Sequence, residues 1–198
     1  MRWGDVNAAA IGVPLGWGAV GLSRASAPLP AQRLFAWNDR PVSSAHPHGV
    51  FQNGFDLVDD RGAVVAVFHG SVWSERGTIS AGSSTWEFGR QGGGYLRLSG
   101  PGGEVASARR TGLFSSTWDL SYDGRSGSLV RRGFWMSRYE LQDPAGGVVG
   151  EVAQDSVFGR GLDVRLPEHV PPQTQAFVAA VVLTLMNRSR RSSASAGA

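Results

Sequence analysis

Apolar and polar residues alternate in short runs along the middle of the chain, and the runs are separated by Gly, Asp, Ser and Pro. Alternation of this kind indicates strands with one buried face, and the intervening residues are those that dominate turns. The runs predict about twelve strands, with no convincing helical period between them. The predicted strands are 33–37, 50–58, 63–69, 71–79, 84–89, 94–99, 104–109, 112–122, 128–132, 134–142, 147–154 and 161–166.

An internal repeat supports this interpretation. FDLVDDRGAVVAV begins at Phe55, LRLSGPGGEVASA at Leu96 and YELQDPAGGVVGEV at Tyr139. Each copy has leucine two residues after its first residue, glycine seven residues after it and valine nine residues after it. This order is typical of a strand, a glycine turn and a returning strand. The repeated leucines should therefore share one face of the sheet; they are Leu57, Leu98 and Leu141.

A different pattern begins near the C-terminus. Residues 174–186 carry no charge and are apolar on every side of a helix, and Pro171 and Pro172 precede them. A helix that is apolar all round is buried either in protein or in lipid. Thirteen residues span ~20 Å, whereas a bilayer core is ~30 Å thick. We therefore predict a buried core helix, with a membrane span as the alternative.

These elements together predict the fold. Closure into a barrel removes the exposed edges of a sheet, and twelve strands make a barrel too wide to be filled by its own side chains. The apolar helix supplies the missing interior. We predict an all-β fold with one helix, namely a closed antiparallel barrel of about twelve strands around a hydrophobic C-terminal helix. A flexible lead-in over 1–32 precedes the barrel at 33–187, and a disordered basic tail follows at 188–198.

Residues 6–23 are uncharged and could be read as a targeting or membrane segment. However, four glycines and a proline interrupt this stretch, so it is a poor helix and a lead-in is the preferred interpretation. GWGAVG, which begins at Gly16, matches the dinucleotide-binding pattern GxGxxG. That motif needs a following helix, and the two prolines in LSRASAPLP prevent one.

The composition excludes several kinds of chemistry. The chain of 198 residues has no cysteine, which removes disulfides, thiolate nucleophiles and cysteine-ligated metal sites. All 19 basic residues are arginine, so mechanisms that need a P-loop lysine or a Schiff base are removed as well. The net charge of +3 and the scattered arginines do not indicate a nucleic-acid partner.

Other residues that could carry chemistry have simpler interpretations. His46 and His48 could hold a metal with a third ligand, but two histidines alone are a weak signal and a solvated loop is preferred. Asp59 and Asp60 could act as an acid–base pair, but they stand where a hairpin turn places aspartate. We expect the tryptophans to pack in the core or at the barrel rim rather than to form a stacking platform. They are residues 3, 17, 37, 73, 86, 118 and 135.

The segment WDLSYDGRSGSLVRR, the following FWMSRYELQDPAGGVVGEV and the closing LPEHVPPQTQAFVAAVVLTLMNR resemble the tubby C-terminal-like superfamily. That superfamily includes the LURP-one-related proteins and the phospholipid scramblases. The resemblance covers about 33–187 and implies a twelve-stranded barrel threaded by a hydrophobic helix. The tubby phosphoinositide site includes a lysine, so it is not carried over. The cysteine-rich segment and the acidic calcium loop of the scramblases are also missing here.

We expect a non-enzymatic barrel module that binds a membrane surface, a lipid or a protein, because the sequence suggests no catalytic constellation. The alternative is a small-molecule carrier or enzyme with its site at the barrel mouth. Arginine pairs at strand ends, together with the tail, are the candidate site for anionic lipid. These residues are Arg109, Arg110, Arg131, Arg132, Arg188, Arg190 and Arg191. We expect no metal and no cofactor, and a cytoplasmic location that is peripheral to a membrane.

Overall fold

The computed structural model describes residues 43–48, 54–71, 74–112, 116–133, 138–155 and 161–195. Within these ranges it contains twelve strands, which form one sheet, and one helix. The elements are β1 (Ser43–Pro47), β2 (Gly54–Val58), β3 (Val64–Ser71), β4 (Arg76–Ala81), β5 (Ser84–Gln91), β6 (Tyr95–Gly100), β7 (Gly103–Arg110), β8 (Thr117–Tyr122), β9 (Arg125–Arg132), β10 (Arg138–Gln142), β11 (Val148–Gln154), β12 (Leu162–Arg165) and α1 (Pro172–Ser195).

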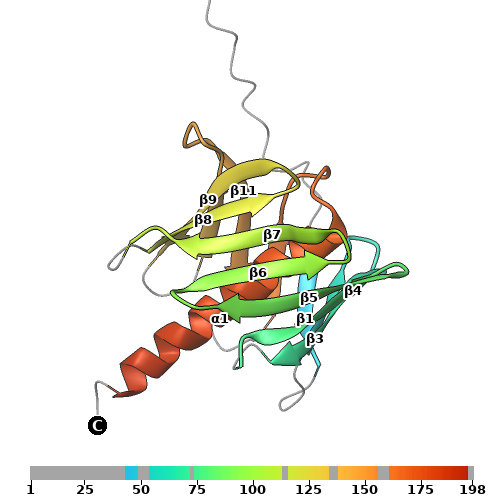
Figure 1. Ribbon diagram of the computed structural model, residues 1–198, viewed down its shortest axis with the longest axis horizontal. Coiled ribbons are helices and arrows are strands. Elements are labelled where there is room, and N and C mark those ends of the chain that lie inside the picture. The colour runs from blue at the N-terminus through green and yellow to red at the C-terminus, as the bar shows by residue number, and fades with distance from the viewer. Residues whose placement is uncertain are drawn as a thin grey trace, which may run out of the picture. The chain divides into compact units, whose positions relative to one another are not determined.

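The strands form a closed antiparallel barrel in which each strand pairs with its neighbours in sequence. β1 closes the ring, because Ser44 lies opposite Val58 of β2 on one side and Asp163 of β12 on the other. Helix α1 runs through the ring of strands, and its C-terminal end extends beyond them (Figure 1). The predicted fold, a twelve-stranded barrel around a C-terminal helix, is confirmed.

The first strand of the described residues was not predicted from the sequence. β1 forms at Ser43–Pro47, in a segment that we expected to be a loop, and the expected strand at 33–37 lies outside the described residues. SSAHP has little local preference for a strand, since it lacks the large aromatic and β-branched residues that favour one. Its extended conformation is held by hydrogen-bonded neighbours on both sides, which complete the barrel.

The three repeat copies form three equivalent hairpins, β2–β3, β6–β7 and β10–β11. Their turn glycines have positive φ angles of 81° at Gly62, 106° at Gly103 and 83° at Gly146. Each hairpin has a register shift just after its repeated leucine. The three leucines are at most 1% exposed, so the prediction that they share the buried face is confirmed. They are Leu57, Leu98 and Leu141.

The aspartate that was predicted to sit in a turn does so. Asp59 Oδ1 accepts hydrogen bonds from the backbone N–H groups of Arg61 at 3.0 Å and Ala63 at 2.8 Å. In the third hairpin Asp143 Oδ1 makes the equivalent bonds to Ala145 at 2.9 Å and Gly147 at 2.7 Å. Aspartate stabilises a turn in this way by accepting hydrogen bonds from backbone N–H groups that do not pair between the strands.

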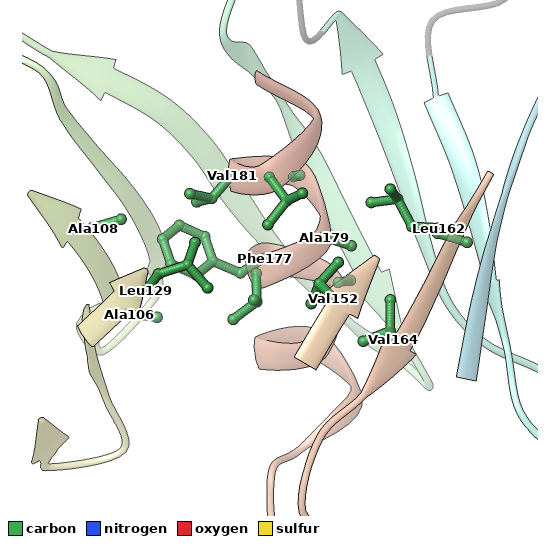
Figure 2. Packing of buried hydrophobic residues seen from close by; sticks show 14 of the residues in the cluster. Ala106, Ala108, Leu129, Val152, Leu162, Val164, Phe177, Ala179 and Val181 are labelled. Atoms are coloured by element: carbon green, nitrogen blue, oxygen red, sulfur yellow. The ribbon is translucent and has the colours of Figure 1, made fainter. Parts of the chain in front are cut away.

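Helix α1 is the core of the barrel. Every residue from Ala176 to Val182 is at most 1% exposed. Phe177 meets Phe88 of β5 with ring centroids 6.0 Å apart. Figure 2 shows Phe177, Ala179 and Val181 surrounded by apolar side chains from strands on both sides of the helix. The predicted burial of Phe177, Val181 and Leu185 is confirmed, whereas Leu183 in the same segment is only partly buried.

The helix is longer than the predicted 174–186. It begins at Pro172 and continues to Ser195, so helix replaces most of the disordered tail expected at 188–198. The last three residues of that segment lie outside the described residues. Two side-chain contacts explain the continuation. Arg188 donates to Glu75 through Nε and Nη2, and Ser192 Oγ donates to the Arg188 carbonyl at 3.0 Å.

Candidate functional site

The two ends of the barrel differ in charge. Because consecutive strands are antiparallel, the turns after β2, β8 and β10 lie at one end, which we call the acidic end. Its turns carry four aspartates against Arg61 in the first turn and Arg125 at the start of β9; the aspartates are Asp59, Asp60, Asp123 and Asp143. The opposite end, which we call the arginine end, is formed by the ends of β5, β7 and β9 and the starts of β4 and β10. Its strands carry Arg76, Arg90, Arg109, Arg110, Arg131, Arg132 and Arg138.

Helix α1 runs from the acidic end to the arginine end. Near its start, Thr174 Oγ1 donates to Asp123 Oδ2 at 3.5 Å, and near its end Arg131 Nη1 donates to Ser189 Oγ at 3.3 Å. The arginine end therefore gathers strand arginines around the part of α1 that leaves the barrel.

A cavity of about 700 Å³ lies at the arginine end, between the barrel rim and the last turns of α1. Five arginines and one glutamate line it among the described residues, a formal charge of +4. The arginines are Arg90, Arg110, Arg131, Arg188 and Arg191. Trp118, Tyr139 and Leu185 provide the less polar part of the lining.

Because side chains alternate along a strand, the two arginines of each predicted pair face opposite ways. Ala108 and Leu129 face the buried interior, so Arg110 and Arg131, two residues further on, face the same way and line the cavity. Their neighbours Arg109 and Arg132 lie on the outer wall, where Arg132 Nε contacts Glu140 Oε2 at 3.1 Å. One member of each pair therefore belongs to the cavity.

On the helix, spacing by three residues determines which arginines face the cavity. Arg188 and Arg191 are three residues apart and line the cavity, whereas Arg190 lies between them in sequence, is exposed and does not. Of the seven predicted site residues, the structure thus brings four together. These are Arg110, Arg131, Arg188 and Arg191.

Glu75 is the carboxylate of the cavity lining, and it joins helix to barrel. Its oxygens accept hydrogen bonds from Arg188 Nε and Nη2, both at 2.7 Å, and one oxygen lies 3.5 Å from Arg90 Nε. The bonded Arg188 guanidinium lowers the pKa of Glu75 below its ordinary value, although burial acts in the opposite direction. Glu75 is 7% exposed and has a φ of 57°, a conformation that side chains rarely adopt.

Two aromatic residues form the floor beside these charges. Arg188 Cζ lies 5.5 Å from the centroid of the Trp118 ring, which is the geometry of a cation–π contact. Tyr139 lies opposite Arg131 across β10 and β9. Burial raises the pKa of Tyr139, and the charge of Arg131 acts against this shift. Tyr139 therefore stays neutral at physiological pH.

Sequence reasoning missed Glu75 and Arg90. Arg90 had a usable signal, because it stands two residues after buried Phe88 and shares its face, but the strand was predicted to end at residue 89. No sequence signal marked Glu75, since it precedes β4 in a turn and its partner Arg188 is 113 residues away. Trp118 was expected to pack at the core or rim, and it is 5% exposed at the cavity floor.

The two histidines of HPHG have different partners. His46 Nε2 lies 2.8 Å from Ser44 Oγ, and His48 Nε2 lies 2.7 Å from Asp56 Oδ1. In the part of the chain that the structure describes, no group of three or more His, Cys, Asp or Glu residues is placed to hold a metal ion. Among the same residues, no helix combines the length and the apolar character needed to cross a bilayer.

The remaining sequence candidates, namely residues 6–23, the GxGxxG match and the tryptophans at 3, 17, 37, 73 and 135, lie outside the described residues. The cavity itself offers guanidinium and hydroxyl donors, and its carboxylate is held in a bidentate ion pair. This set of groups is suited to binding an anion. Comparisons with protein-family models, with curated proteins and with solved structures found no match to this chain.

Proposed function

We propose that the protein is a non-enzymatic binding module whose arginine end attaches it to an anionic lipid surface. The observation that carries the proposal is the separation of charge along the barrel axis. Arginines gather where α1 emerges, and aspartates occupy the turns at the other end. A protein with this charge distribution is oriented by the field of a negative surface, with its basic end toward the surface.

We assign this role to exposed arginines that lie outside the cavity. Arg109 and Arg190 are exposed at the arginine end and lie outside the cavity lining. A basic residue near an anionic bilayer contributes about 1 kcal/mol, and salt screens this attraction. Attachment is thus expected to be peripheral, reversible and dependent on several arginines.

Flotation with vesicles tests the proposal. At low salt the full chain should float with vesicles of phosphatidylcholine and phosphatidylserine, should not float with phosphatidylcholine alone, and should be released as salt rises. The double variant Arg109→Gln/Arg190→Gln should bind about 30-fold more weakly, since it removes about 2 kcal/mol. The matched control Arg61→Gln/Arg125→Gln removes the same charge at the acidic end and should bind like the parent.

Three results would overturn the proposal. The first is equal flotation with both vesicle types, and the second is no flotation at low salt. The third is an equal loss of binding in the two double variants, which would show that net charge matters and the arginine end does not.

A carrier or enzyme with its site at the barrel mouth is the second candidate, and the cavity favours it. Among the described residues, buried apolar side chains of the helix and the strands pack together beside α1. The mouth cavity, with its arginines, offers a small molecule a polar binding site.

A further inference from the structure

The cavity at the arginine end has an excess of positive charge that its own carboxylate does not balance. Glu75 offsets one unit of charge, and it is engaged by Arg188 through both oxygens and by Arg90 at 3.5 Å. The lining retains a formal charge of +4. Like charges that converge repel one another, so a bound anion would stabilise this arrangement.

Arg131 is the clearest anion ligand in the lining. It is inward-facing and partly buried, and its Nη1 atom donates to Ser189 Oγ at 3.3 Å. Within the described ranges, no carboxylate pairs with it, and its buried Nε atom has no hydrogen-bond acceptor. The guanidinium is therefore held between strand and helix before any ligand arrives, which lowers the entropy cost of binding.

The size and lining of the cavity indicate more than a bare ion. About 700 Å³ lies within the range of small-molecule sites. Trp118, Tyr139 and Leu185 offer apolar and aromatic surface beside the arginines. A dianion matches the charge better than a carboxylate does, and arginine binds phosphate oxygens through paired N–H groups.

We propose that the mouth cavity binds a phosphate group attached to an organic body, with Arg131 and Arg110 as ligands to the phosphate and Trp118 beside the body. The group can belong to a soluble phosphate ester or to a lipid headgroup. The inference deepens the proposed function, and it rests on that function only for the lipid source.

Calorimetric titration of the full chain with phenyl phosphate, inorganic phosphate and benzoate tests the inference. Phenyl phosphate should bind most tightly, and benzoate, which has the same ring but a single charge, should bind at least about tenfold more weakly. Arg131→Gln should weaken phenyl phosphate binding about tenfold or more, whereas its neighbour Arg132→Gln should change it less than about twofold.

Thermal unfolding establishes that each variant is folded. If Arg131→Gln does not fold, Arg110→Gln replaces it as the inward-facing variant, and Arg132→Gln remains the outward-facing control. No binding of either phosphate, or equal losses in the inward and outward variants, would overturn the inference.

Vesicles separate the two sources of the phosphate group. Phosphatidic acid presents a phosphate monoester, whereas phosphatidylglycerol presents a diester. A preference for phosphatidic acid that Arg131→Gln removes supports a lipid source. Arg131-dependent binding of phenyl phosphate without that preference supports a soluble ester. The protein could instead bind anionic vesicles through Arg109 and Arg190 and bind neither phenyl phosphate nor inorganic phosphate. That result would contradict the cavity site and would still support the proposed surface attachment.

Discussion

Replacement of Val181 by alanine tests the central claim about the fold, because burial decides the sign of the effect. Val181 is 0% exposed in the middle of α1 and lies among strand side chains (Figure 2). In an exposed helix this change would be stabilising by up to about 0.7 kcal/mol, since alanine has the higher helix propensity. In a closely packed core it removes two methyl groups and leaves a cavity.

The expected size follows from these two contributions. Each buried methyl group contributes about 0.5–1.5 kcal/mol, so losing two costs about 1–3 kcal/mol. The gain in propensity offsets up to about 0.7 kcal/mol of this loss. Subtracting this gain leaves an expected fall of about 0.3–2.3 kcal/mol in the free energy of unfolding, and the Tm should fall by about 1–9 °C for a domain of this size.

Equilibrium unfolding in urea measures the change, and the same substitution at an exposed valine provides the control. Val64 in β3 is 55% exposed, so Val64→Ala should alter the free energy of unfolding by less than about 1 kcal/mol. A Val181→Ala protein as stable as the parent, or more stable, would refute the burial of α1 within the barrel. An unchanged slope m in both variants would show that the comparison concerns the same unfolding reaction.

Two further predictions concern single positions. The pKa of Glu75 is lowered in the folded protein, so its ionised form stabilises the fold above the unfolded pKa, and this contribution is lost as pH falls through the folded value. Glu75→Gln should therefore lower stability at pH 7 and flatten the dependence of unfolding on pH below about 5, and a parallel profile for both proteins would contradict the ion pair with Arg188. Gly146→Ala should cost about 1–2 kcal/mol because φ is 83°, although nothing crowds the added carbon. Gly92→Ala, equally open and without a positive φ, should cost less, and equal urea midpoints would remove the conformational explanation.

The hairpins and the core helix were predictable because their signals are local. Alternation placed Leu57, Leu98 and Leu141 on one face, and a glycine at a constant distance marked each turn. Both features follow from the geometry of neighbouring residues along one strand. The helix was recognisable because its thirteen residues carry no charge and place apolar side chains on every side, which is typical of a buried helix. Closure followed from the need to cover sheet edges and fill a wide interior.

The features that local pattern could not supply all depend on partners distant in sequence. SSAHP becomes β1 because β2 and β12 hydrogen-bond to it, and its composition alone favours a loop. Helix α1 continues to Ser195, and Arg188 within that extension meets Glu75 across 113 residues. The arginine pairs were visible, but strand register determines that Arg110 and Arg131 face the cavity while Arg109 and Arg132 face outward. Side chains separated in the chain acquire a common site only when the barrel closes, because closure alone brings strand ends and helix terminus to one place.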